Sequence, residues 1–172
     1  MFKRVMLTAV ALSVLAGLGW APAQAQSAKA MMKDANGKDV GVVELVEAED
    51  GVLLTAKLSG LPAGVHAFHV HAVGQCEPPF TSAKGHFNPE GKKHGLMAEG
   101  GHHAGDMPNI HVPASGELTI EVFNDEISLK KDEDETVFDA DGSAIVIHAK
   151  GDDYKSDPAG DAGPRIACGV IQ

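Results

Sequence analysis

Every second residue is apolar in two stretches of this chain, residues 52–58 and 118–123, and the residues between them are mostly polar. A period of two is the pattern of a β-strand with one face in the core and one face in water. No stretch after residue 25 shows a helical period of useful length. Strong turn dipeptides, Asn-Gly or Asp-Gly, stand at 36–37, 50–51 and 141–142. The sequence therefore predicts an all-β protein.

Five more segments rich in apolar and β-branched residues are expected to be strands: 28–34, 39–48, 65–71, 143–149 and 165–171. An uncertain strand near 127–130 brings the count to seven or eight. That number is typical of a Greek-key β-sandwich or flattened β-barrel with about eight antiparallel strands. Two long segments, 72–110 and about 149–164, contain no predicted strand, and loops of such length in a compact domain are usually functional.

The first 25 residues have the features of a secretory signal peptide. Two basic residues precede an apolar run from Val5 to Trp20, and small residues at 23 and 25 suit a signal peptidase. An uncleaved transmembrane anchor is the alternative, but the polar residues after the run favour cleavage. We expect a signal peptide at 1–25, one domain at 26–172 and an exported, periplasmic protein; secretion into the medium would give the same pattern.

The charge of the chain argues against two classes of partner. It has 14 basic and 24 acidic residues. Residues 1–25 hold two basic residues and no acid, so the remainder has 12 against 24 and a net charge of about −12. Such a surface repels nucleic acid and anionic lipid, so we expect neither as a partner after cleavage.

Cys76 and Cys168 are the two cysteines of the chain. In an exported protein a disulfide between them is favoured over two free thiols. The bridge would close a loop of roughly 90 residues. By restricting the unfolded chain, a loop of that length stabilises the folded state by about 4–5 kcal/mol.

Histidine is unusually frequent in one part of the sequence. All nine histidines lie between 66 and 148, and histidine is the commonest metal ligand. In the strand predicted at 65–71, the period of two places His69 and His71 on one face and His66 on the other. The pair can chelate one ion, whereas His66 is expected to have a structural role.

The long loop 72–110 supplies a second set of possible ligands. Three imidazoles and one carboxylate suit a tetrahedral zinc ion: His86, His94, His103 and Asp106. Glycines at 85, 91, 95 and 105 would allow tight turns between them. His148, which ends a predicted strand, offers a third nitrogen to the His69–His71 pair.

Four segments resemble the signatures of the copper/zinc superoxide dismutase family: GVHAFHVH at 64–71, GHFNP at 85–89, HAGD at 103–106 and RIACGV at 165–170. The resemblance extends over essentially all of residues 26–172. It implies a β-barrel enzyme with a long metal-binding loop and a second active-site loop. The implied reaction is the dismutation of superoxide to oxygen and hydrogen peroxide by a histidine-bound copper bridged to zinc.

The resemblance also implies two ligand sets, for one copper and one zinc ion per subunit. Copper is expected at His69, His71, His86 and His148, and zinc at His86, His94, His103 and Asp106. Asp152 matches a carboxylate that hydrogen-bonds one copper and one zinc histidine and so orients both. Cys76 and Cys168 match the disulfide of the family.

Two residues are expected to be catalytic by the same resemblance. His86 would bridge the metals and take up a proton, and Arg165 would attract superoxide and hydrogen-bond it beside copper. Lys84 and Lys155 are candidates to help attract the anion.

The sequence departs from the family pattern at two positions. His102 stands where the family commonly has proline, but His103 has the required spacing to Asp106. Pro164 precedes Arg165 and restricts the backbone before it. His111, outside the motifs, is expected on the surface.

Two functions without catalysis remain as alternatives. One is an exported copper/zinc-binding protein without dismutase activity, and the other is an inert β-domain. The complete ligand set argues against the inert domain, and an anion-attracting arginine argues against a mere metal store. The sequence does not decide between a monomer and a homodimer.

Overall fold

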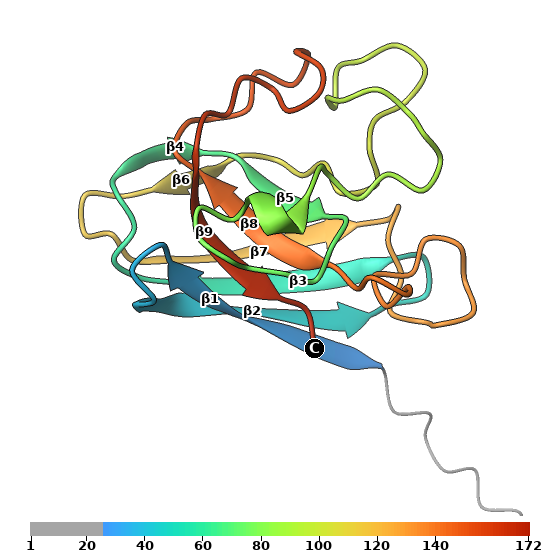
Figure 1. Ribbon diagram of the computed structural model, residues 1–172, viewed down its shortest axis with the longest axis horizontal. Coiled ribbons are helices and arrows are strands. Elements are labelled where there is room, and N and C mark those ends of the chain that lie inside the picture. The colour runs from blue at the N-terminus through green and yellow to red at the C-terminus, as the bar shows by residue number, and fades with distance from the viewer. Residues whose placement is uncertain (1–25) are drawn as a thin grey trace, which may run out of the picture.

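The computed structural model describes residues 26–172, and the predicted signal peptide, residues 1–25, lies outside them. Within 26–172 the structure has nine strands and one short 3₁₀ helix (Figure 1). The elements are β1 (Ser27–Asp34), β2 (Asp39–Glu47), β3 (Val52–Leu58), β4 (Gly64–His66), β5 (Phe68–His71), η1 (Thr81–Ala83), β6 (Ile110–Val112), β7 (Leu118–Asn124), β8 (Ala144–His148) and β9 (Arg165–Val170). The all-β prediction is confirmed.

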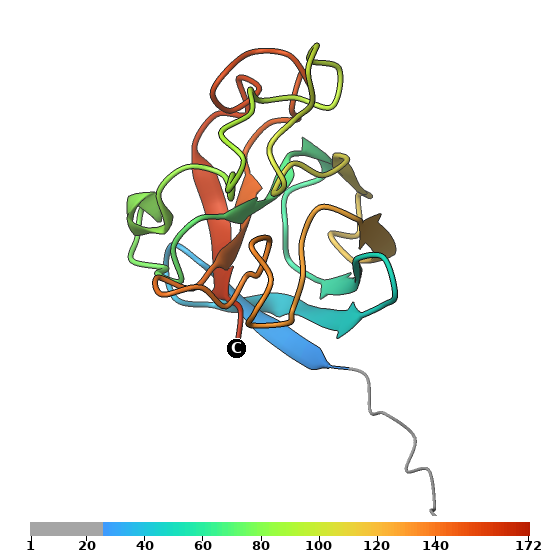
Figure 2. The ribbon, with the colours of Figure 1, turned by 90° about the vertical axis from the view of Figure 1, so that its right-hand side faces the viewer.

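Seven strands form one curled antiparallel sheet in the order β5-β8-β9-β1-β2-β3-β7, and β4 pairs with β6. The view in Figure 2 shows the curled sheet as a half-barrel around the core. Neighbours far apart in the chain, β1 with β9 and β3 with β7, mark the crossovers that a Greek-key barrel requires. No helix within 26–172 has the length and apolarity to cross a bilayer.

Strand alternation places the core on the concave side of the sheet. In β3, Val52, Leu54, Ala56 and Leu58 are buried and the residues between are more exposed. In β1, Met32 is fully buried whereas the side chain of Met31 is 52% exposed. The two adjacent methionines therefore point to opposite faces, as the strand period requires.

The structure differs from the strand predictions at three places. The segment 65–71 forms two strands instead of one, because β4 pairs with β6 and β5 with β8, and Ala67 at the break bonds His148 at the end of β8 and Lys150 just after it. The prediction of a strand near 127–130 is wrong, since that described segment has a single bridge between Ser128 and Thr136. A short strand, β6, was not predicted.

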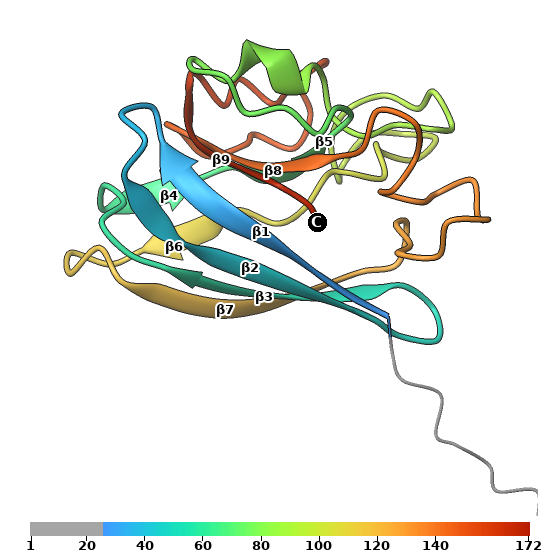
Figure 3. The ribbon, with the colours of Figure 1, turned by 60° about the horizontal axis from the view of Figure 1, so that its bottom comes forward.

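The long loop 72–110 is ordered by two separate apolar clusters and a disulfide. Phe87 belongs to the main core, whereas Phe80 packs with Ala83 of η1 in a smaller cluster. The predicted disulfide between Cys76 and Cys168 is present and ties the loop to β9. In Figure 3 the green loop with η1 lies beside β8 and β9, away from β7.

Candidate metal centre

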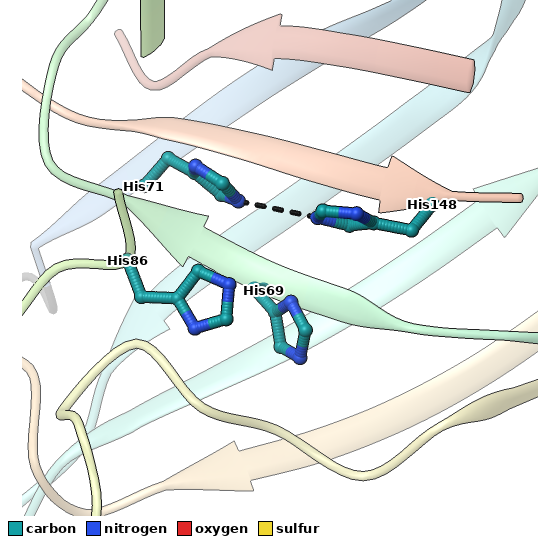
Figure 4. Close-up of side chains that lie close together, drawn as sticks. All are labelled: His69, His71, His86 and His148. Carbon is teal, nitrogen blue, oxygen red and sulfur yellow. Dashed lines mark hydrogen bonds between the residues drawn. The ribbon is translucent and has the colours of Figure 1, made fainter. Parts of the chain in front are cut away.

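Four histidines from three parts of the chain meet beside β5. His69 and His71 come from β5, His148 ends the neighbouring strand β8, and His86 comes from the long loop (Figure 4). All four are buried, and each offers a ring nitrogen within 4.8 Å of the others. The structure thus brings together the whole set predicted for copper.

The backbone of Val70, between the two β5 histidines, fixes the loop against the strand. Its N–H donates to Gly105 and its carbonyl accepts from Phe87, both at 2.9 Å. A Cβ on Gly105 would collide with the Val70 carbonyl. Glycine is needed at 105 for this close approach and not for a turn, because its φ is not in the left-handed region.

Hydrogen bonds leave one free nitrogen on each of the three strand histidines. His71 Nδ1 donates to the Lys84 carbonyl at 2.9 Å and His148 Nδ1 to the Gly163 carbonyl at 3.1 Å. Their Nε2 atoms then carry lone pairs and face each other at 3.4 Å (Figure 4). His69 Nε2 bonds Asp152 at 2.8 Å, and its buried Nδ1 has no hydrogen-bond partner among residues 26–172.

His86 presents its two nitrogens to two different sets of residues. Its Nδ1 lies 2.7 Å from Asp106 Oδ1, whereas its buried Nε2 has no hydrogen-bond partner in the part of the chain that the structure describes. Imidazole is able to bind a different ion through each nitrogen. His86 is the residue that the two clusters share.

The second cluster consists of buried donors: His86, His94, His103 and Asp106. Asp106 Oδ1 lies 2.7 Å from His86 Nδ1, 3.0 Å from His94 Nδ1 and 3.5 Å from His103 Nδ1. A tetrahedral zinc ion with bonds of about 2.0–2.1 Å needs donor separations of roughly 3.3 Å. Three imidazoles and one carboxylate at these separations fit zinc.

A different observation indicates that the copper set fits a copper ion. Two buried ring nitrogens, His69 Nδ1 and His86 Nε2, lack a hydrogen-bond partner within the described residues. Unpaired buried polar atoms are costly unless something else binds them. All-imidazole donors suit copper(II), so the donor chemistry and the unpaired nitrogens agree.

Asp152 connects the two clusters. Its Oδ2 lies 2.8 Å from His69 Nε2 and its Oδ1 lies 3.0 Å from His94 Nε2. The side chain is buried, and a Cβ on Gly160 would overlap its carboxylate. Hydrogen bonds of this kind set both the tautomer and the orientation of a ligating histidine.

Burial favours the neutral form of three copper-set imidazoles, those of His71, His86 and His148, and neutral imidazole is the form that binds metal. It lowers the pKa of His86 to about 4, against the opposing hydrogen bond to Asp106. Burial and then the neighbouring His69 lower the pKa of His148 to about 3. Burial, followed by His86 and Arg165, holds the pKa of His71 well below its usual value.

The carboxylates of the site remain charged. Burial alone would raise the pKa of Asp106, but hydrogen bonds from His103, His86 and His94 hold it well below its usual range. The pKa of Asp152 is also lowered, because bonds from His69 and His94 outweigh burial. Burial opposes charge on His94 too, yet its bonds to Asp106 and Asp152 raise its pKa to about 9. A metal ion at His94 Nδ1 must therefore displace a proton.

Arg165 begins β9 and lies beside the copper set. It pairs with His148 across β8 and β9. Its guanidinium donates to the backbone carbonyls of Phe80 and Lys84, and the Lys84 carbonyl also accepts from His71 Nδ1. One carbonyl thus holds both the arginine and a copper-set histidine. Burial lowers the pKa of Arg165, but a guanidinium stays charged at neutral pH.

The other residues singled out in the sequence lie outside both clusters. His66 is buried between the carbonyls of His148 and Pro62. His102 Nδ1 bonds the His103 carbonyl at 2.9 Å and is not among the four zinc-set donors. His111 is exposed on β6, and Lys84 and Lys155 are also exposed.

Sequence reasoning missed two residues that contact Asp152, Asn109 and Tyr154. Tyr154 is the sole tyrosine of the chain, and this rarity was only a weak indication of a role at the site. Nothing in the sequence pointed to Asn109, because the partners of its side-chain amide are backbone atoms.

Comparison with known proteins gives a consistent result. Residues 40–171 match a family model described as copper/zinc superoxide dismutase. The chain is 52% identical over 147 residues to superoxide dismutase [Cu-Zn] 2 of Aquifex aeolicus, which covers 84% of this chain and 86% of that protein.

The solved structures that are similar to this one include the following two. Copper/zinc superoxide dismutase from Brucella abortus has a TM-score of 0.70 and 32% identity, over 86% of this chain and 100% of that one. A superoxide dismutase-like protein from Bacillus subtilis has a TM-score of 0.81 and 37% identity, over 84% and 97%.

Proposed function

The chain belongs to the copper/zinc superoxide dismutase family, and its activity is therefore the dismutation of superoxide. We propose that this activity depends on the following metal ligands. Copper is held by His69, His71, His86 and His148, and zinc by His86, His94, His103 and Asp106. In the reaction two superoxide anions and two protons give one oxygen and one hydrogen peroxide.

One observation carries this assignment: two buried four-donor clusters share a single imidazole, His86. Its Nδ1 lies among the zinc-set donors, and no described residue forms a hydrogen bond with its Nε2. A store for one type of ion has no need of this arrangement. Copper, when bound, supplies the one-electron couple of the reaction, and zinc, which has no redox chemistry, supplies charge and fixed ligand geometry.

Residues of the chain provide the two other things that the reaction requires, a positive charge for the anion and a group that transfers protons. Arg165 supplies a positive charge next to the copper set and, through its two carbonyl partners, a fixed orientation. Because the folded domain is strongly acidic as a whole, attraction of an anion depends on such a local positive field. The buried His86, whose Nε2 has no hydrogen-bond partner among residues 26–172, is placed to accept a proton at that atom and give it up again.

The assignment predicts a definite metal content. Protein dialysed against excess copper and zinc and then freed of weakly bound ions should contain one ion of each per chain, measured by elemental analysis. Binding of two ions of one kind to both clusters with equal strength, in the presence of both metals, would contradict two distinct sites.

We further propose that residues 1–25 are a signal peptide and that the domain, residues 26–172, functions in the periplasm. An apolar run and small residues at 23 and 25 support this. The intact mass of protein recovered from the periplasmic fraction should correspond to a chain that begins at Gln26. A mass that includes residues 1–25 would contradict cleavage.

A further inference from the structure

Asp152 can orient one histidine of each metal set only if its own position is fixed. It lies in the second loop, residues 149–164, which has no strand or helix within it. A carboxylate on such a segment has no rigid element of its own to hold it. The structure shows instead a group of contacts to the metal-binding loop.

The side-chain amide of Asn109 forms hydrogen bonds with both the N–H and the carbonyl of Asp152. The Asn109 amide donates from Nδ2 to the Asp152 carbonyl at 2.9 Å, and its Oδ1 accepts from the Asp152 N–H at 2.7 Å. Asn109 lies three residues after the zinc-set Asp106 and immediately before β6. This paired bond therefore joins the second loop to the anchored end of the metal-binding loop.

Tyr154 makes three further bonds, one within the second loop and two to the metal-binding loop. Its N–H donates to Asp152 Oδ1 at 2.6 Å, and its phenolic oxygen accepts from the Asn109 N–H at 2.8 Å. Its carbonyl accepts from the Met97 N–H at 3.2 Å. One residue thus contacts the carboxylate, its anchor Asn109 and the zinc-loop segment that follows His94.

The backbone of Tyr154 has an unusual conformation that this role explains. Its φ is 64°, in the left-handed region that a bulky side chain rarely adopts. The Tyr154 carbonyl also lies close to Gly95 of the metal-binding loop, since a Cβ on Gly95 would overlap it. An unfavourable conformation persists where the surrounding contacts impose it.

We propose that Asn109 and Tyr154 are positioning residues that lock the second loop onto the metal-binding loop and so orient Asp152 between the copper and zinc histidines. The inference rests on the metal assignment proposed above. The stability of zinc binding and the ligand field of copper then depend on two residues that touch neither ion.

The first variant is Tyr154→Phe, which removes one oxygen atom and keeps the ring. Zinc release from the purified holoprotein to a chelator is measured together with the visible and electron paramagnetic resonance spectra of copper(II) at full occupancy. Removing supporting partners of metal ligands typically weakens binding about 10- to 100-fold. Because Tyr154 acts one bond further out, we expect zinc release to be faster by roughly 3- to 10-fold, with a changed copper spectrum.

Asn109→Ala removes both bonds to the Asp152 backbone and should have a larger effect, about 10- to 100-fold on zinc release. His111→Gln is the matched control, because it lies two residues away with an exposed side chain and should release zinc as the wild type does. If Asn109→Ala does not fold, Tyr154→Phe still decides the question.

A lowered unfolding temperature in Tyr154→Phe, with zinc release and copper spectrum equal to those of wild type, would overturn the proposal and leave a purely structural tether. Failure of the metal assignment looks different, since wild-type protein would then not hold copper and zinc at separate sites. Zinc release and spectra need no dismutase activity, so the two failures are distinguishable.

Discussion

Replacing His86 by alanine is expected to lower the dismutation rate by roughly three orders of magnitude or more and to weaken zinc and copper binding together. His86 is the one residue common to both four-donor clusters, so its loss removes a ligand from each. It also removes the buried imidazole placed to accept and return a proton, a contribution typically worth about 10²–10⁴-fold in rate. The rate is measured at equal protein concentration, with metal content determined in the same samples.

Variants of ligands that belong to one cluster serve as matched controls. His71→Ala, in the copper set, should lose copper and keep zinc, whereas His103→Ala, in the zinc set, should lose zinc and keep copper. Of these three ligand variants, only the His86 variant should lose both ions. Intact activity of His86→Ala, or loss of one ion alone, would contradict a shared ligand.

Arg165→Ile is expected to lower the dismutation rate by roughly 10- to 100-fold while leaving both ions in place, within the range that electrostatic steering contributes. The guanidinium is the charged group bonded to the same Lys84 carbonyl as His71, yet it is not a donor in either cluster. The wild-type rate should fall as salt is added, because salt screens an attraction. The variant should lose that dependence.

Arg165→Lys separates charge from geometry. A lysine keeps the positive charge but lacks the planar fork that bonds two carbonyls at once. Its rate should lie between those of wild type and Arg165→Ile. An unchanged rate in Arg165→Ile at full copper content would remove this residue from the mechanism.

The strands of the barrel could be predicted where one face meets the core and the other meets water. Residues 52–58 alternate clearly, and β3 has those bounds. The prediction failed at 127–130, where apolar Ile127 and Leu129 pack in the main core from a segment that has an isolated bridge and no ladder. It also missed the break at Ala67, because the hydrogen bonds that cause it come from a segment about 80 residues away.

The metal donors could be predicted because their chemistry is visible in the residue type. Two histidines at alternate positions of a strand must share a face, and β5 places His69 and His71 in one cluster. The support around Asp152 could not be predicted in the same way. Each bond that Asn109 and Tyr154 make to Asp152 or to each other joins a side-chain atom to a backbone N–H or carbonyl, and such contacts leave no pattern in the order of residues.

The most direct test of the central claim is the rate of superoxide dismutation by protein that holds one copper and one zinc ion, with and without cyanide, which blocks accessible copper. We predict a fast rate that cyanide abolishes. A negligible rate at full occupancy of both metals would contradict the assignment and favour a protein that binds copper and zinc without catalysis.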